Sequence, residues 1–313
     1  RSLLLAALVL SLMVSPARAG WFSSWFGEDT YTETRYPIVL AHGMFGFDSL
    51  AGVDYWYRIP QELERSGADV HVTQVAALNS TAARGEQLAR QVEEILATTG
   101  ADKVNLIGHS HGGPTIRYVA SVYPQYVASA TSVGGVNQGS KVADVAQGLT
   151  EGSGLAASTI KTLGNALGDL IDLLSGGGYD QDVLASLSDL TSDALNDFNQ
   201  RYPEGVPANR CGEGNRYASN GVQYFSRSGT RPLTNVLDAS DALLGLTSLI
   251  FTGQSSDGLV SRCSSHLGQV IRDDYRMNHL DEVNQLFGLH HLWATDPTTV
   301  YRQQASRLKN AGL

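Results

Sequence analysis

Residues 105–114, with the sequence NLIGHSHGGP, place a serine between two glycines in the pattern G-x-S-x-G. The pattern consists of Gly108, Ser110 and Gly112; a short apolar run precedes it, and the helix-like segment PTIRYVASVY follows it. On a sharp turn between a strand and a helix, a serine hydroxyl is exposed as a nucleophile, and a Cβ two residues away on either side would clash. We therefore predict that Ser110 attacks a carbonyl carbon. A polar loop that is merely rich in glycine is the alternative, and the flanking patterns argue against it.

A serine nucleophile of this kind needs two N–H donors for the oxyanion that forms during attack. One donor is expected from the main chain of the next residue, His111. The segment LAHGMFGFD ends an apolar run at His42 and Gly43, so the main-chain N–H of Met44 is expected to supply the second donor. An ordinary turn at the end of a strand is the alternative interpretation of this segment.

The general base is sought downstream, because the acid and then the histidine follow the serine in hydrolases of this pattern. Four histidines qualify: His266, His279, His290 and His291. We expect His279 to be the base, because oxygen-rich residues that could bind a hard cation follow it and would hold its loop still. These residues are Asp281, Glu282 and Gln285. His266 is the alternative.

The acid of the triad is expected to be Asp257. It lies in SSDGLV, after the apolar run TSLIFTG and before a glycine, which is the format of a loop at the end of a strand. Asp238 and Asp241, in LDASDALLG, are the competing acids. Asp238 is the second choice, although it would be needed elsewhere if a metal is bound.

The elements that must position these residues follow from short apolar runs rich in β-branched side chains. Such runs predict buried strands at residues 36–43, 68–75, 103–110 and 127–135. Between them, residues 82–100 carry apolar side chains at helical spacing and end at a glycine. Strand and helix in alternation predict an α/β fold with a parallel sheet.

Residues 153–176 carry a helical apolar stripe with glycines on both sides. The stripe consists of Leu163, Leu167, Leu170, Ile171 and Leu174. An apolar helical face must be buried against the protein or against lipid, so we predict a lid over the site. A core helix that stays docked is the alternative, because it has the same periodicity.

The first residues predict export. One arginine, an apolar stretch and the small-residue sequence ARA indicate a signal peptide at residues 1–19, followed by a single domain at residues 20–313. The apolar stretch is shorter than the roughly 20 residues that cross a bilayer, which argues against a membrane anchor. In an oxidising compartment Cys211 and Cys263 are expected to form a disulfide, with two buried thiols as the alternative. A net charge of −9 argues against nucleic acid as a partner.

Four segments carry a more specific pattern: YPIVLAHGMFGFD, VNLIGHSHGGPTIRYVA, DGLVSRCSSHLG and IRDDYRMNHLDEVNQLFGL. In these segments, and over residues 36–313, the chain resembles the secreted triacylglycerol lipases of the Pseudomonas and Burkholderia type, in the α/β-hydrolase superfamily. The resemblance implies an α/β-hydrolase fold, a mostly parallel central sheet with helices on both faces and a helical lid insertion. It also implies long-chain triacylglycerols as substrates. A carboxylesterase or phospholipase with the same triad, or a non-catalytic binding protein of the same fold, is the alternative.

The resemblance assigns roles to particular residues. Its triad falls on Ser110, Asp257 and His279, and its oxyanion hole falls on the amides of Met44 and His111. It implies one structural Ca²⁺, held by the side chains of Asp238 and Asp281 and the main-chain carbonyls of Gln285 and Leu289. It further implies the Cys211–Cys263 disulfide, the lid at residues 153–176, secretion through the periplasm and a membrane-anchored foldase as a folding partner. One departure is Val136-Asn137, where the resemblance predicts Pro-His.

Overall fold

The computed structural model describes residues 29–44, 49–50, 53–76, 79–148, 162, 165, 169 and 186–313. The predicted signal peptide lies outside these ranges, and so does the predicted lid, apart from Thr162, Asn165 and Asp169, which are helical and exposed. In the described part, no helix has the length and apolar character needed to span a membrane.

The core of the fold is a six-stranded sheet with the strand order β4-β1-β5-β6-β7-β8, and every neighbouring pair is parallel. Its strands are β1 (Ile38–Ala41), β4 (Val70–Thr73), β5 (Val104–His109), β6 (Val127–Val133), β7 (Gln223–Gly229) and β8 (Gln269–Tyr275). A separate antiparallel pair joins β2 (Ser49–Leu50) and β3 (Val53–Asp54). The first four strands of the sheet confirm the four predicted runs.

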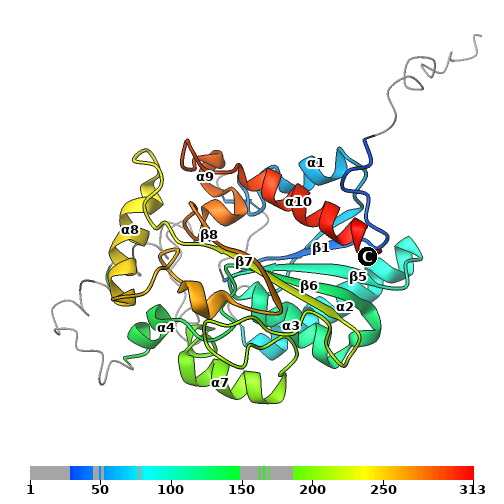
Figure 1. Cartoon of the computed structure of the whole chain (residues 1–313), viewed down its shortest axis with the longest axis horizontal. Coiled ribbons are helices and arrows are strands. Elements are labelled where there is room, and N and C mark those ends of the chain that lie inside the picture. The colour runs from blue at the N-terminus through cyan, green and yellow to red at the C-terminus, as the bar shows by residue number, and fades with distance from the viewer. Residues whose placement is uncertain are drawn as a thin grey trace, which may run out of the picture.

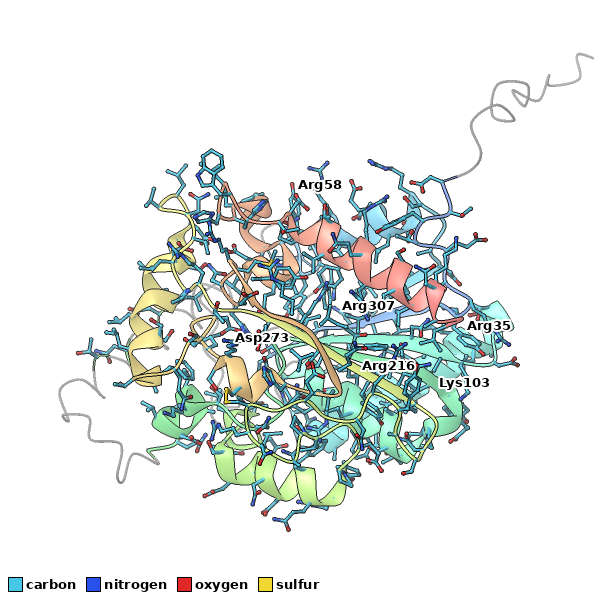
Figure 2. All side chains as sticks on the ribbon, viewed as in Figure 1. Arg35, Arg58, Lys103, Arg216, Asp273 and Arg307 are labelled. Carbon is cyan, nitrogen blue, oxygen red and sulfur yellow. A yellow bond between two sulfur atoms is a disulfide. The ribbon has the colours of Figure 1, made fainter. Side chains whose placement is uncertain are left out.

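Helices cover both faces of the sheet, as Figure 1 shows. From β1, the side chains of Val39 and Ala41 pack in one apolar cluster with α2 (Thr81–Thr99) and α3 (Gly112–Val122). The alternate side chains of Ile38 and Leu40 pack in a second cluster with α1 (Ile59–Glu64) and α10 (Pro297–Asn310). This alternation is what a strand buried on both faces requires, and side chains fill the space between the layers (Figure 2).

The helix predicted at residues 82–100 is α2, and its two ends follow from single residues. The side chain of Ser80 accepts a hydrogen bond from the N–H of Ala83, and Gly100 ends the helix with a φ of 71°. The remaining described helices are α4 (Lys141–Ala146), α7 (Ser192–Arg201), α8 (Ala239–Thr247) and α9 (Gln285–Gly288), with 3₁₀ turns η1 (Pro124–Tyr126), η2 (Ser248–Phe251), η3 (Arg262–Ser265) and η4 (Asp281–Val283).

The prediction of a strand end before Asp257 is wrong. The apolar segment ahead of it continues α8 into η2, and the hydroxyl of Ser248 donates to the carbonyl of Gly245 at 2.6 Å inside this helical turn. A short apolar run is compatible with either a buried strand or a buried helix, so periodicity alone could not decide between them. The patterns also did not predict β7 and β8.

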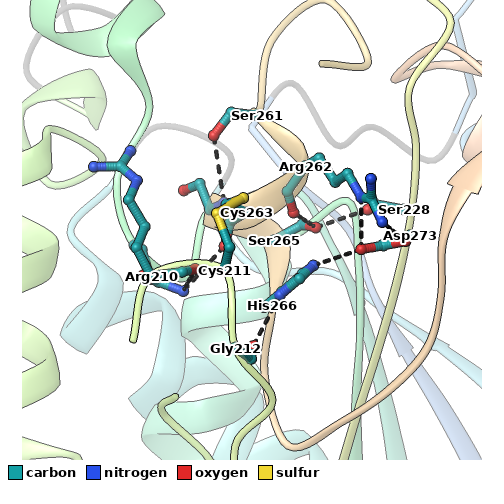
Figure 3. Close-up of a disulfide and its surroundings, with 12 residues drawn as sticks. Arg210, Cys211, Gly212, Ser228, Ser261, Arg262, Cys263, Ser265, His266 and Asp273 are labelled. Atoms are coloured by element: carbon teal, nitrogen blue, oxygen red, sulfur yellow. Dashed lines mark hydrogen bonds and ion pairs between the residues drawn. A yellow bond between two sulfur atoms is a disulfide. The ribbon is translucent and has the colours of Figure 1, made fainter. Parts of the chain in front are cut away.

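A disulfide joins Cys211 to Cys263, with the Cα atoms 4.5 Å apart. The loop that carries Cys211 is also held by His266, as Figure 3 shows. Nδ1 of His266 lies 2.9 Å from the carbonyl oxygen of Gly212, and Nε2 lies 2.9 Å from Oδ2 of Asp273 on β8. The disulfide and this histidine together fasten the loop to the edge of the sheet.

Candidate active site

Ser110 lies at the turn between β5 and α3. Its φ is 57°, in the left-handed region that residues other than glycine rarely adopt. The Ser110 N–H donates to the carbonyl of Val133 at 3.1 Å, and the Ser110 carbonyl accepts from the N–H of Gly113 at 2.9 Å. These two bonds hold the strained turn at the carboxyl end of β5.

The glycines around Ser110 leave no room for a side chain. A Cβ on Gly108 would lie 2.2 Å from the carbonyl oxygen of Gly112, and one on Gly112 would lie 2.3 Å from the carbonyl oxygen of Ala41. A Cβ on Gly43 would lie 2.7 Å from the Cβ of Ser110. The last distance places the loop after β1 directly against the serine.

His279 and Asp257 form a buried pair. Nδ1 of His279 lies 2.7 Å from Oδ2 of Asp257. The other carboxylate oxygen of Asp257 accepts from the N–H groups of Leu259 and Val260, at 2.9 and 2.7 Å. Since a carboxylate accepts all of these bonds, Nδ1 of His279 carries the proton and Nε2 is left as the basic nitrogen.

His109, the residue before Ser110, contacts the loop of His279. Its Nε2 lies 2.9 Å from the main-chain oxygen of His279, and the two ring centroids are 4.5 Å apart. This contact places the predicted base against the side chain of the residue that precedes Ser110. The structure therefore pairs Asp257 with His279 and ties the loop of His279 to the end of the strand that precedes Ser110.

The loop after β1 is anchored by its carbonyl groups. The guanidinium of Arg84 donates to the carbonyl of His42 at 2.6 Å and to the carbonyl of Gly43 at 3.2 Å. In a trans peptide the N–H points away from the carbonyl of the same unit. The Met44 N–H, which shares a peptide unit with the Gly43 carbonyl, is therefore directed away from Arg84.

His42 adds a second anchor on the same carbonyl. Its Nε2 accepts from the N–H of Val75 at 3.2 Å, so Nδ1 carries the proton and donates to the carbonyl of Gly43 at 2.8 Å. Burial, together with the positive charge of Arg84, lowers the pKa of His42 to about 4. His42 is thus a neutral structural residue at neutral pH.

The amide of His111 is oriented in the same way. It shares a peptide unit with the Ser110 carbonyl, which also accepts from the N–H of Val136 at 3.3 Å. His111 is the N-cap of α3, where the helix dipole favours negative charge. Its imidazole is buried, with Nε2 2.8 Å from Oγ1 of Thr81, and burial lowers the pKa of His111 well below its ordinary value. In the described ranges, no protein acceptor engages this amide or that of Met44.

Two of the predicted calcium ligands are buried carboxylates with an unsatisfied oxygen. Within the described residues, Oδ2 of Asp238 and Oδ1 of Asp281 have no hydrogen-bond partner, and neither side chain forms a salt bridge. Burial, with nearby negative charges, raises the pKa of Asp281 to about 7, and burial also raises that of Asp238. Two buried carboxylates that no described basic side chain neutralises fit a site for a hard metal ion.

The two predicted carbonyl ligands lie at the two ends of α9. Gln285 is its first residue, and Leu289 follows its last. The side-chain amide of Gln285 donates to the main-chain carbonyls of Asp54 and Tyr55, the former at 2.8 Å. This part of the chain is therefore tied to the segment after β3.

A second cluster of possible metal ligands consists of His109, His279 and Glu282, whose ligand atoms all lie within 4.8 Å of one another. It shares no residue with the predicted calcium ligands, and it contains the predicted base. Nε2 of His109 already bonds the main-chain oxygen of His279. Burial and the charge of Asp257 raise the pKa of Glu282 well above its ordinary value. We therefore treat this cluster as part of the site of Ser110.

The alternative site residues have other partners. His266 lies between Gly212 and Asp273, in the disulfide loop. Asp238 caps α8 by accepting from the N–H of Ser240 at 2.7 Å. Asp241 accepts from the N–H groups of Thr234 and Asn235 and from the side chain of Asn278. His290 and His291 lie after α9, and the main-chain oxygen of His290 accepts from the side chain of Asn235.

Val136-Asn137, the departure from the expected Pro-His, is buried beside the turn of Ser110. Val136 packs in an apolar cluster with Met44. The side-chain amide of Asn137 donates to the hydroxyl of Ser132 and to the main-chain carbonyl of Ser265, both at 2.9 Å. The asparagine thus ties the end of β6 to the loop of the disulfide.

Sequence reasoning missed Arg84, Tyr55 and His109 as parts of this site. Arg84 lies in a helix that reads as an ordinary amphipathic one, and a buried arginine is uncommon unless it is paired. His109 was within the nucleophile pattern, but nothing in its spacing indicated a partner. Only the folded chain shows these contacts.

Comparisons with known proteins agree with this fold. A family model described as alpha/beta hydrolase fold matches residues 36–283. A triacylglycerol lipase of Vibrio cholerae is 58% identical over 98% of each chain, and one of Burkholderia plantarii is 39% identical over 97% of this chain and 92% of its own. The crystal structure of the mature Bacillus licheniformis lipase BlEst2 has a TM-score of 0.57 at 19% identity, covering 80% of this chain and 89% of that one.

Proposed function

We propose that this chain, which belongs to the bacterial triacylglycerol lipases of the α/β-hydrolase superfamily, hydrolyses the ester bonds of long-chain acylglycerols through an acyl-enzyme on Ser110. The observation that carries the proposal is the buried pair of His279 and Asp257 beside the strained turn of Ser110. The names of relatives that match nearly the whole chain support the choice of substrate.

In the first step, Nε2 of His279 accepts the proton of Ser110 as the hydroxyl oxygen attacks the ester carbonyl. Asp257 keeps the proton on Nδ1 and stabilises the imidazolium that forms. His279 then donates its proton to the leaving alcohol. Water hydrolyses the acyl-enzyme with the same histidine as base, which restores Ser110.

The oxyanion of each tetrahedral intermediate would be held by the N–H groups of Met44 and His111. Both peptide units are anchored through their carbonyls, and among the described residues no acceptor engages the two N–H groups, which supports their role as donors to the substrate. Because these donors are in place before the reaction, they cost no reorganisation as charge develops. In other enzymes, the removal of one such donor lowers kcat about 10²- to 10³-fold.

A bound Ca²⁺ would be structural. Asp238 and Asp281 would supply carboxylate oxygens, and Gln285 and Leu289 would supply main-chain carbonyls. A calcium ion bound there would neutralise the two buried carboxylates and stabilise the loop that begins at His279. The site chemistry supports calcium because all four donors are oxygen atoms.

The remaining parts of the proposal concern the export of the chain, its folding and the place where the enzyme acts. The signal peptide at residues 1–19 would direct export, the protein would be secreted through the periplasm, and a foldase there would assist folding. The mature enzyme would act at a lipid–water interface, with residues 153–176 as its lid. The Cys211–Cys263 disulfide suits an oxidising compartment.

The decisive experiment is covalent labelling with a nitrophenyl alkylphosphonate, which traps a serine nucleophile that has a working base. We expect one label on the peptide that contains Ser110, and none in Ser110→Ala, with unchanged thermal unfolding in the variant. A label on another residue, or activity of Ser110→Ala above a few per cent, would refute the assignment. Rates measured across the solubility limit of an ester then separate a lipase, which prefers the emulsified form, from an esterase.

A further inference from the structure

A chain of hydrogen bonds crosses the site behind Ser110. The N–H of Gly43 donates to the hydroxyl oxygen of Tyr55 at 3.0 Å, and this oxygen lies 2.6 Å from Nδ1 of His109. Nε2 of His109 lies 2.9 Å from the main-chain oxygen of His279. The chain therefore begins in the loop after β1, here called the oxyanion loop because it carries Met44. It passes through the residue before Ser110 and ends in the loop of His279.

The positions of the protons in this chain follow from its two ends. A main-chain oxygen only accepts, so the Nε2 atom of His109 must donate to His279. Nδ1 of His109 is then the acceptor in this imidazole, so the hydroxyl of Tyr55 donates its proton to Nδ1 while its oxygen accepts from Gly43. His109 is then neutral, with the proton on Nε2. Burial and the charge of His279 lower the pKa of His109 well below its ordinary value, which agrees with this arrangement.

We call the hydrogen bonds that join Gly43, Tyr55 and His109 the relay. Both of its side chains are held firmly. Tyr55 and His109 are buried, and the side-chain amide of Gln285 donates to the main-chain carbonyl of Tyr55. A Cβ on Gly43 would lie 2.9 Å from the hydroxyl oxygen of Tyr55, so the tyrosine is packed directly against the oxyanion loop. A movement of Gly43 away from Tyr55 would break the hydrogen bond between them.

We propose that Tyr55 and His109 are positioning residues for the acyl-transfer reaction. The hydroxyl of Tyr55 fixes the oxyanion loop through Gly43 and fixes the tautomer of His109, which in turn holds the main chain of His279. The inference rests on the proposed function, since it assigns how donors and base are kept in place around Ser110. Tyr55 acts through Gly43 and His109, and His109 acts through the main chain of His279.

The physical consequence of losing the relay is a small displacement. Without the hydroxyl of Tyr55, the N–H of Gly43 and Nδ1 of His109 are left buried without partners. The oxyanion loop and the histidine loop then relax independently of each other. A misplacement of about 1 Å in such a site costs on the order of 10²-fold in rate.

The test compares Tyr55→Phe with Tyr224→Phe, using a soluble short-chain nitrophenyl ester. Tyr224, on β7, is the matched control. It is also buried, and its hydroxyl oxygen accepts a hydrogen bond from the side chain of Asn220 at 2.9 Å. We expect Tyr55→Phe to lower kcat about 10- to 100-fold with KM changed less than about threefold. Tyr224→Phe is expected to keep kcat within about twofold of wild type. If the two variants unfold at the same temperature, the difference in kcat does not come from stability.

A second pair of variants tests the donor on His109. His109→Gln keeps an N–H that can reach the main-chain oxygen of His279, whereas His109→Leu does not. We expect the glutamine variant to keep more of kcat than the leucine variant. Equal losses in the two, with both folded, would contradict the proposal.

The protonation of His109 is measured without turnover, from nitrogen-15 spectra of the imidazole in the wild-type protein. We expect the proton on Nε2 in the pH range of activity, and a changed Nδ1 signal in Tyr55→Phe. A proton on Nδ1 of the wild type, or a Tyr55→Phe enzyme with unchanged kcat, would overturn the inference. Phosphonate labelling of wild-type Ser110 tests the proposed function separately, so the two failures are distinguishable.

Discussion

His279 is bound twice to Asp257. The imidazole Nδ1 lies 2.7 Å from the carboxylate Oδ2, and the main-chain N–H of His279 donates to the main-chain carbonyl of Asp257 at 3.0 Å. The main-chain bond fixes where the histidine leaves the backbone, and the side-chain bond fixes its ring. A small movement of either loop would therefore disturb both the position and the tautomer of the base.

The assignment of His279 as the base predicts a severe effect of His279→Ala. We expect kcat/KM to fall by at least about 10³-fold, because the base is lost while the fold remains. His266→Gln is the matched control, since this histidine is bound to Gly212 and Asp273 instead. Its kcat/KM should stay within about tenfold of wild type. A greater loss in the His266 variant would show that the base has been misassigned.

Calcium is predicted to act on stability. With free Ca²⁺ at one hundred times its dissociation constant, the free energy of unfolding should rise by about 2.7 kcal/mol relative to chelated protein. Asp281→Asn should abolish this increment, because it removes the charge of a buried ligand. Asp274→Asn is the control, since Asp274 is exposed and paired with Arg272. Thermal unfolding with and without chelator measures the effect, and an equal response of both variants would exclude calcium at this site.

Reduction of the disulfide is predicted to destabilise the fold. The bridge closes a loop of 52 residues, for which the chain-entropy model gives about 4 kcal/mol, an upper value for measured effects. We expect a lower midpoint of urea unfolding after reduction, and the same midpoint in the double variant Cys211→Ala, Cys263→Ala. Oxidised and reduced protein with equal midpoints would show that the loop is held by its other contacts alone.

The low pKa of His42 predicts a pH-dependent stability. The folded chain protonates His42 only near pH 4, whereas the unfolded chain does so near 6.5. As the pH falls through this window the unfolded state gains the proton first, so the free energy of unfolding falls, by about 3 kcal/mol in total. In His42→Gln the slope should be shallower by up to about 1.4 kcal/mol per pH unit. Urea unfolding at several pH values measures this, and identical slopes in both proteins would disprove the shift.

Much of the fold could be predicted because its central strands are short, apolar and β-branched. β8 could not, because it is an edge strand that contains three consecutive charged residues, Arg272, Asp273 and Asp274. β7 is buried but contains Ser226, whose hydroxyl oxygen accepts from the N–H of Leu267, and Arg227, which lies over the ring of Tyr301. Polarity alone makes such a segment look like a loop.

The same limit applies to the site. Ser110 could be predicted because a single local pattern specifies the turn, its glycines and its helix. The relay of Gly43, Tyr55 and His109 could not, since it joins three segments whose contacts exist only after folding. Local patterns reveal the residue that reacts, whereas its supports are distributed along the chain.

The packing of α10 against α1 has a consequence for the order in which the chain folds. The rings of Trp56 and Tyr301 lie 5.9 Å apart, and Arg302 donates to the carbonyl of Glu62, 240 positions away, at 2.9 Å. The part of this face that α10 covers therefore stays exposed while the intervening chain emerges. Contacts so distant in sequence form slowly, and the exposed apolar surface favours aggregation in the meantime. A folding assistant would be most useful in the interval before α10 arrives, and a truncated chain without α10 would remain trapped in it.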